Sequence, residues 1–174
     1  MHAERRLAEL GLPLDALADN YALDTSGAKF VSHLAVGELL WLSGTVPERD
    51  GLPYLTGVVG ADLTLEQGYE AARYAALSAL IALHHALGDL DRMLQVVQMT
   101  GWVNSAPGFN DQPRVINGAT DLLVEVYGQR GMGTRAAIGC TGLGYGSSVE
   151  VFLVVRYDGG PLTEPMPTAG ATGG

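Results

Sequence analysis

Two residues of opposite charge stand in an otherwise uncharged stretch, residues 131–155, with the sequence GMGTRAAIGCTGLGYGSSVEVFLVV. They are Arg135 and Glu150. A guanidinium can hold the carboxylate of a ligand through two parallel hydrogen bonds, and a neighbouring carboxylate can position a water molecule or move a proton. The pair therefore has the groups needed to bind a small carboxylate and act on it. A cross-strand salt bridge on a solvated face would use the same two residues, and both interpretations are open at this point.

The two residues are predicted to lie on neighbouring strands. Residues 134–141 form a short, nearly uncharged run that ends in a glycine cluster, and residues 148–156 are rich in β-branched side chains, which is typical of a hairpin. If the hairpin is centred on the 142/143 peptide bond, Arg135 and Glu150 are directly opposite, with Cβ atoms about 5 Å apart. This arrangement requires a connecting loop with an even number of residues.

Alternation divides each strand into two faces. The sets expected in the core are Val149, Val151, Leu153 and Val155 from the second strand and Ala136, Ile138 and Cys140 from the first. The other face would carry Arg135, Glu150 and Phe152. Because Cys140 is the single cysteine, no intramolecular disulfide is possible, and we expect it to be buried and inert.

Composition limits the class of protein. The chain has 174 residues, of which 47% are hydrophobic and 17% charged, so it is expected to form one globular domain. It contains no apolar run of the roughly 18 residues that a membrane span needs. Its start, MHAERRLAELG, has no apolar secretory segment, so a cytoplasmic location is expected. The net charge of −9 argues against nucleic acid as a partner.

Metal binding is not predicted either. The histidines are His2, His33, His84 and His85, and no two of them have the i, i+4 spacing that places two imidazoles on one helix face. The pair at 84 and 85 is expected to stabilise the C-terminal end of a helix.

Three helices are expected. A short, peripheral one spans residues 3–10 and ends at glycine and proline. The longest begins at Thr64, where Gln67 completes a capping box, and it stops at Gly88. The third covers residues 111–128, where apolar residues recur every three or four positions and Pro113 falls in the first turn.

The remaining elements are strands and loops. Strands are predicted within residues 28–43, around a turn at 36–38, and at 94–103; residues 48–60 form a loop with a short strand at 56–59; and the Gly/Pro/Thr tail at 158–174 is flexible. In this order two helices cover one face of a mixed sheet. The other face is too apolar to remain exposed to solvent. We therefore expect an oligomer with Arg135 and Glu150 at or near the interface.

Several short motifs follow one another in an order that resembles a known family. They are GELLWLSG at 37–44, GADLT at 60–64, GDLDR at 88–92, Phe109 with VING at 115–118, TRAAIG at 134–139 and VEV at 149–151. The sequence resembles the reactive-intermediate deaminase family (Rid, or YjgF-like), and within it the longer members. The resemblance implies an α+β, chorismate-mutase-like fold and a homotrimer with active sites between neighbouring subunits. It divides the chain into an N-terminal extension (1–27), a Rid-like domain (28–157) and a flexible tail (158–174).

The resemblance also implies an activity. Arg135 matches the arginine that grips the substrate carboxylate, and Glu150 matches the carboxylate near the attacking water. The implied reaction is hydrolysis of an enamine or imine, such as 2-aminoacrylate, to a keto acid and ammonia, with no cofactor and no metal.

Four further positions are implied to bind substrate. Ser43 and Gly44 match the strand end that lines the pocket, and Asn117 matches an asparagine on the helix. Phe30 stands where the short deaminases have tyrosine, and residues 142–145 replace their usual Leu-Pro turn; these departures bear on the identity of the substrate more than on the fold.

Two alternatives use the same scaffold. The protein could bind and sense small carboxylates without catalysis, in which case Arg135 is needed and Glu150 is dispensable. It could also catalyse another hydrolase, lyase or isomerase step of a catabolic pathway. Endoribonuclease activity is disfavoured by the charge. Chorismate mutase activity would need several cations around a dicarboxylate, and nothing in the sequence places further arginines there.

Overall fold

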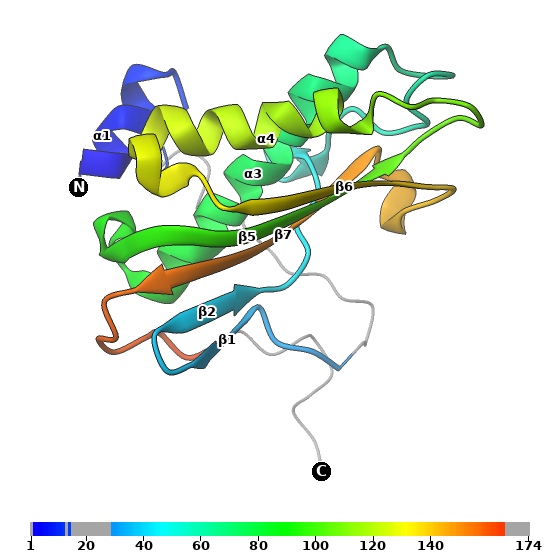
Figure 1. Ribbon diagram of the computed structural model, residues 1–174. Helices are drawn as coiled ribbons and strands as arrows, with labels where there is room; N and C mark the ends of the chain where they lie inside the picture. Colours follow the sequence, from blue (N-terminus) through cyan, green and yellow to red (C-terminus); the bar gives the residue numbers. More distant parts are fainter. Residues whose placement is uncertain (1, 13, 15–28, 166–174) are drawn as a thin grey trace.

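The protein is built around a five-stranded mixed sheet. The computed structural model describes residues 2–12, 14 and 29–165 (Figure 1). The strands, in spatial order, are β1 (His33–Val36), β2 (Leu39–Leu42), β7 (Val149–Tyr157), β5 (Met93–Asn104) and β6 (Thr134–Cys140). Strands β5 and β6 are parallel, and the other neighbours are antiparallel. A separate two-stranded ribbon, β3 (Glu48–Arg49) with β4 (Leu52–Pro53), lies in the region predicted as a loop.

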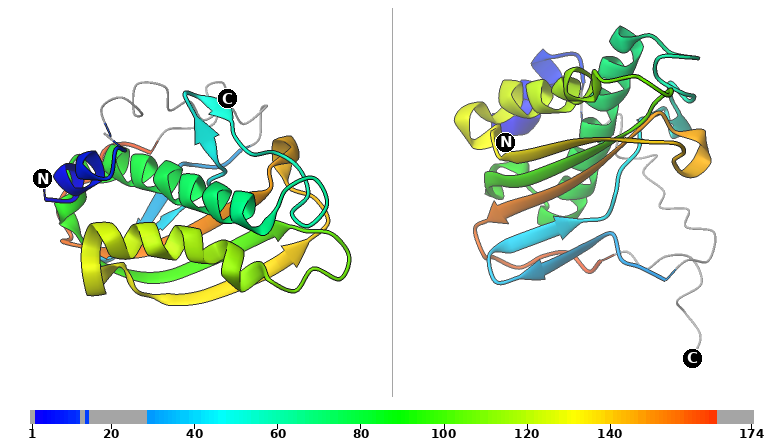
Figure 2. Two further views of the ribbon diagram at one scale, coloured as in Figure 1. Left: turned by 90° about the horizontal axis from the view of Figure 1, so that it is seen from above. Right: turned by 45° about the vertical axis from the view of Figure 1, so that its right-hand side comes forward.

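The helices gather on one face of the sheet. Helices α3 (Leu65–Leu87) and α4 (Gln112–Tyr127) cover it, and α1 (His2–Glu9) packs against α4 (Figures 1 and 2). The described residues also contain three short 3₁₀ turns: η1 (Leu90–Arg92), η2 (Gly128–Gly131) and η3 (Gly144–Gly146). The predicted α+β class and mixed sheet are confirmed, with α1 as a third helix. In the part of the chain that is described, no helix is long and apolar enough to cross a membrane.

Helix α3 forms as its local sequence predicts. The Thr64 hydroxyl accepts from the backbone N–H of Gln67 at 3.2 Å, and the Gln67 side chain accepts from the Thr64 N–H at 2.8 Å. At the other end Gly88 has a φ of 75° and donates to the His84 carbonyl at 2.7 Å. The alanines of the small-residue side are all buried: Ala71, Ala72, Ala75, Ala76 and Ala79. They let the helix lie close to the rest of the core.

Helix α4 crosses α3 at very short range. A Cβ added at Gly118 would overlap the backbone carbonyl oxygen of Tyr69 in α3. On the outer side the helices are linked by Arg73 and Glu125, 2.6 Å apart, and by the Tyr69 hydroxyl, which donates to Asp121 at 2.8 Å. The position of α4 over the sheet is therefore fixed by backbone contact.

The predicted hairpin of residues 134–156 is wrong, because β5 lies between β6 and β7. Helix α4 connects β5 to β6 as a crossover, which makes these two strands parallel neighbours. The other edge of β5 then pairs with β7. The segment from Thr141 to Ser148, which connects β6 to β7, therefore passes around the end of β5. At that end the Asn104 N–H donates to the Ser148 carbonyl at 2.8 Å.

The register also corrects the predicted faces. Met99 of β5 pairs with both Arg135 and Leu153, so these three side chains share the helix-covered face. Trp102 pairs with Ile138 and Glu150, which therefore lie on the open face. The apolar set of β7 is buried as predicted. On β6, by contrast, Ala136, Ile138 and Cys140 point away from the helices, and Cys140 is half-buried. Arg135 and Glu150 are on opposite faces and two strands apart.

Both ends of the described chain pack against the rest of the domain. Ala3 and Leu7 of α1 are buried. After β7, the Thr163 N–H donates to the Ala86 carbonyl at 3.0 Å, and Arg92 pairs with Asp158 at 2.9 Å. Residues 15–28 of the expected extension and 166–174 of the expected flexible tail lie outside the described residues. Residues 56–59 make isolated bridges, to Ser147 among others, instead of the predicted short strand.

Candidate functional site

Arg135 is held in a defined orientation by helix α4. Its Nη1 donates to Asn117 Oδ1 at 2.8 Å and to Thr120 Oγ1 at 3.0 Å, and its Nη2 lies 3.5 Å from the Pro113 carbonyl oxygen. Asn117 and Thr120 are three residues apart, so both face the same way on the helix. Since Nη1 has two hydrogens and both are engaged, Nε and Nη2 form the side of the guanidinium that can grip a carboxylate bidentately. The side chain is exposed at the edge of the sheet.

Glu150 lies on the open face, directly over Gly44. Trp41 pairs with Val154 and Thr45 with Val151, so the segment after β2 has one residue more than the strand it faces. This extra residue is a bulge that turns Gly44 toward the open face. A Cβ at Gly44 would overlap Glu150 Oε1 and lie 2.9 Å from the Phe152 ring. Only glycine leaves room for the carboxylate there.

The environment of Glu150 makes it a better proton acceptor. Burial raises the pKa of the Glu150 carboxyl above its ordinary value, because the charged form loses contact with water. In the described part of the chain, its carboxylate forms no ion pair. A carboxylate with a raised pKa is better matched to proton transfer near neutral pH.

Ser43 and Phe30 line a cavity beside β1 and β2. The cavity has a volume of about 240 Å³ and is lined by Phe30, Val31, His33, Leu34, Trp41, Leu42 and Ser43. The Ser43 hydroxyl donates to the Val31 carbonyl at 2.6 Å. Ser43 therefore closes the start of β1 against the end of β2, in addition to forming part of the cavity wall.

His33 separates this cavity from a second one. The second cavity, about 220 Å³, is lined by His33, Leu34, Ala35 and residues 162–165. The His33 Nε2 lies 3.1 Å from the Thr163 carbonyl oxygen, and Nδ1 lies 3.0 Å from the Ser32 hydroxyl. Because a carbonyl only accepts, Nε2 carries the hydrogen. Burial lowers the pKa of His33, which favours the neutral ring.

The six predicted site residues thus form two groups. Arg135 and Asn117 are in contact at the β6 edge. Gly44 and Glu150 are in contact on the open face, and Ser43 and Phe30 line the cavity that begins beside Gly44. Within one chain the groups lie on different faces of the sheet.

Comparison with known proteins identifies the family to which this fold belongs. Residues 4–156 match the family described as "YjgF/chorismate mutase-like, putative endoribonuclease". The chain belongs to this YjgF-like family. The match includes helix α1 as well as the sheet and the two large helices.

Individual relatives support the assignment to the YjgF-like family. "Protein TCP17" of Trypanosoma cruzi is 39% identical over 153 residues, which cover 87% of this chain and 92% of that protein. A crystal structure of a protein of unknown function from Agrobacterium tumefaciens has 34% identity and a TM-score of 0.76, covering 90% of this chain and 93% of that one. A "putative endoribonuclease" from Shewanella oneidensis has 30% identity and a TM-score of 0.81, covering 88% and 98%.

Sequence reasoning missed two parts of the site in this YjgF-like chain. Thr120 binds the same guanidinium nitrogen as Asn117, and its i, i+3 spacing from Asn117 is a signal that could have found it. The apolar cavity wall was also missed. Trp41 and Leu34 pair across β1 and β2, and their alternation with buried neighbours could have placed them on the open face.

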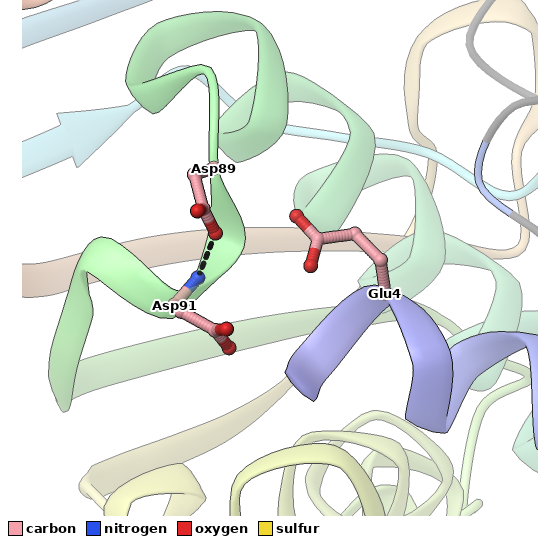
Figure 3. A group of neighbouring side chains, drawn as sticks. All are labelled: Glu4, Asp89 and Asp91. Atoms are coloured by element: carbon pink, nitrogen blue, oxygen red, sulfur yellow. Dashed lines mark hydrogen bonds between the residues drawn. The ribbon is translucent and has the colours of Figure 1, made fainter. Parts of the chain in front are cut away.

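A cluster of three carboxylates lies away from both groups. Glu4, Asp89 and Asp91 have oxygens within 4.8 Å of one another (Figure 3). Backbone N–H groups bind all three: Asp91 accepts from Ala3 at 3.0 Å, Glu4 from Leu90 at 2.9 Å and Asp89 from Asp91 at 2.8 Å. Asp91 also accepts from His2 and so caps the start of α1. The cluster attaches α1 to η1, and we assign no ligand to it.

Proposed function

We propose that this protein hydrolyses enamines or imines of the 2-aminoacrylate type to keto acids and ammonia, without a cofactor. The observation that carries the proposal is Glu150, a half-buried carboxylate without a cationic partner among the described residues. Burying a charge in this way costs stability, and carboxyls with a shifted pKa are frequent at functional sites. A role of Glu150 in proton transfer would explain why the chain contains this destabilising buried carboxylate.

The reaction needs two protein groups. Arg135 would hold the substrate carboxylate through Nε and Nη2 while α4 fixes Nη1. Glu150 would take a proton from water as the water oxygen bonds to the imine carbon. Passing this proton to the nitrogen gives a carbinolamine. When Glu150 moves the hydroxyl proton of the carbinolamine to the same nitrogen, the C=O bond forms, the C–N bond breaks, and ammonia and a keto acid leave. An enamine is first protonated at carbon to give the imine. The sum is imine plus water to keto acid plus ammonia.

The site would be completed in a homotrimer, with Arg135 of one chain facing Glu150 of its neighbour. The open sheet face carries large exposed apolar side chains, with exposed fractions of 59% for Leu34, 64% for Val36 and 40% for Trp41. A surface of this kind is usually covered by another subunit. A head-to-tail ring joins two different patches of the same chain and would bring the two separated groups together.

The physical evidence does not favour RNA as substrate. The net charge is −9, and two of the arginines on the helices and turns are already paired with carboxylates, Arg73 with Glu125 and Arg92 with Asp158. Polyanion binding draws its affinity from concentrated, available cations. The alternative is a non-catalytic carboxylate sensor, and the experiment below must distinguish it from a deaminase.

The decisive experiment is ammonia release from imines generated in situ by an amino-acid oxidase. Wild type should accelerate release, and Arg135→Ala should lose about 100-fold or more in kcat/KM, since a misplaced substrate alone costs about that factor. Arg5→Ala, at a side chain 68% exposed on α1, is the matched control and should be unaffected. If wild type accelerates no imine, the deaminase proposal fails. Arg135-dependent calorimetric binding of small carboxylates would then favour the sensor.

A second experiment tests the shared site. Arg135→Ala and Glu150→Gln chains are refolded together and compared with each variant alone. In a randomly mixed ring about one quarter of the sites combine an intact arginine with an intact glutamate, so about that share of wild-type activity should return. Native mass spectrometry confirms that mixed oligomers formed. Mixed oligomers without recovered activity would rule out a site shared between chains.

A further inference from the structure

We propose that an internal water molecule binds at the end of β5, between the side chains of Asn104 and Ser147. Ser147 belongs to the connection from β6 to β7 and precedes Glu150 by three residues. The water joins this connection to β5 where the chain enters β7. It takes no part in the proposed imine chemistry, so its test is independent of that function.

Two buried oxygens at this end of the sheet need a hydrogen-bond partner. Asn104 Oδ1 and Ser147 Oγ have none within the described residues, and the exposed fractions of the two residues are only 6% and 1%. The residues are neighbours, because Asn104 Nδ2 lies 3.4 Å from the Ser147 carbonyl oxygen. Unbonded, each oxygen would cost the free energy of its lost hydration. Such pairs of buried polar groups are the usual partners of internal water.

The chain encloses the two oxygens. Asn104 follows Trp102 by two residues, so its side chain points to the open face of the sheet. There the connection from β6 to β7 curls around the end of the sheet (Figure 1), and the Gly57 carbonyl oxygen lies 3.4 Å from Asn104 Nδ2. Because both oxygens have almost no accessible surface within one chain, a neighbouring subunit cannot reach them. Their partner has to be a small molecule or ion inside the chain.

The chemistry of the site favours water over a cation. A hard cation takes about six or more oxygen ligands, but nearby carbonyls are already acceptors: that of Ser148 from the Asn104 N–H, and that of Leu55 from the Ser148 hydroxyl. A water molecule needs only about two to four partners. It donates to Asn104 Oδ1, which can only accept, and it accepts from the Ser147 hydroxyl. One water therefore satisfies both oxygens.

The water can be observed directly in the wild-type protein. A crystal structure at about 1.5 Å resolution should show an oxygen about 2.7–3.2 Å from both Asn104 Oδ1 and Ser147 Oγ. In solution, ¹⁷O magnetic relaxation dispersion counts the water molecules that stay bound for longer than the protein tumbles. Wild type should hold one more of these than Asn104→Leu, which replaces the acceptor by an apolar side chain of similar size. Ser148→Ala is the matched control and should match wild type, because the buried Ser148 hydroxyl already has the Leu55 carbonyl as its partner.

Hydrogen exchange tests whether the water fastens the connection. The Gly57 N–H donates to the Gly146 carbonyl at 2.9 Å, so its exchange reports on this attachment. In Ser147→Ala it should exchange about two- to tenfold faster, the factor that one net hydrogen bond is worth. Ser78→Ala, which removes a buried hydroxyl that bonds the Tyr74 carbonyl within α3, should leave it unchanged. Equal exchange in Ser147→Ala and wild type would show that the water does not hold the connection.

Two other results would overturn the assignment. One is a dry site, in which Ser147 Oγ bonds Asn104 Oδ1 directly and the water counts of wild type and Asn104→Leu are equal. The other is a bound cation, which would raise the wild-type Tm in KCl, NaCl or NH4Cl relative to choline chloride at equal ionic strength. We expect no such cation-specific rise. If Asn104→Leu does not fold, the wild-type crystal structure and the salt series still decide.

Discussion

Gly118→Ala tests how the helix crossing positions Arg135. In a helix interior, alanine is about 1 kcal/mol more favourable than glycine. The added Cβ, however, would overlap the Tyr69 carbonyl oxygen and approach its carbonyl carbon to 2.9 Å and the Arg73 nitrogen to 3.2 Å. These are backbone atoms that no side-chain rotation can move, so the helices must separate.

The expected loss of stability follows from these two effects. Overpacking costs about 1–3 kcal/mol, and contact with backbone places Gly118 near the upper end, about 3 kcal/mol by the same rule. Subtracting the helix-propensity gain of about 1 kcal/mol leaves a net loss of about 2 kcal/mol. For a chain of this size that corresponds to a fall in Tm of about 4–8 °C.

The catalytic activity of Gly118→Ala should also be lower, separately from its stability. Asn117 and Thr120 hold the Arg135 guanidinium from α4, and a shift of about 1 Å in a positioning group can cost about 100-fold. We therefore expect reduced kcat/KM for imine hydrolysis at temperatures where Gly118→Ala is still fully folded.

Gly68→Ala is the matched control for thermal unfolding and for imine kinetics. Its added Cβ would meet only side-chain methyl groups of Val59 and Val115, at 3.1–3.3 Å, which can yield by a few tenths of an ångström. Its stability should stay within about 1 kcal/mol of wild type, because propensity gain and crowding nearly cancel. Equal stability and full activity for both variants would show that the helix crossing does not position Arg135.

Three further predictions concern carboxylates. Because burial raises the folded-state pKa of Glu150 and Glu48, the free energy of unfolding should fall as pH rises from the unfolded pKa through the raised one. Glu150→Gln and Glu48→Gln should therefore raise Tm at pH 7–8, with the gain vanishing toward acid pH; equal gains at both ends of a pH series of thermal scans would contradict this. Wild-type kcat/KM should decline as pH falls through the raised pKa of Glu150, and Glu150→Gln should lose about 10²- to 10⁴-fold while Glu48→Gln stays active. Asp91→Ala should cost about 1 kcal/mol in urea unfolding through the lost cap of α1, whereas Glu9→Ala, at a side chain 52% exposed on the same helix, should cost about 0.5 kcal/mol or less; equal midpoints for the two would show that the cap contributes no stability.

Elements with local signals were predictable from the sequence. The capping box at Thr64, the left-handed Gly88 and the small-residue side of α3 are all found as expected. Helix α4 begins and ends within one residue of its prediction. These features depend on neighbours within about four positions along the chain, which a sequence pattern records directly.

Strand pairing was not predictable in the same way. Alternation assigns side chains to two faces but does not name the partner strand. Residues 134–156 have the composition of a hairpin. In the structure, however, the α4 crossover places β6 beside one edge of β5, and β7 pairs with the other edge. On β6 both faces carry small residues, so the burial signal was weak. That is why Ala136, Ile138 and Cys140 were assigned to the wrong side.

The structure excludes one of the two interpretations that the sequence left open, a cross-strand salt bridge between Arg135 and Glu150 within the chain. A salt bridge would neutralise Arg135 with Glu150, but the guanidinium contacts the amide oxygen of Asn117, the hydroxyl of Thr120 and the carbonyl of Pro113. Neutral acceptors orient a cation without cancelling its charge, so the guanidinium can still attract an anion. Glu150, over Gly44, is likewise not neutralised by any described cation. Two oriented charges that the chain itself leaves uncompensated are better suited to a ligand than to stabilising the fold.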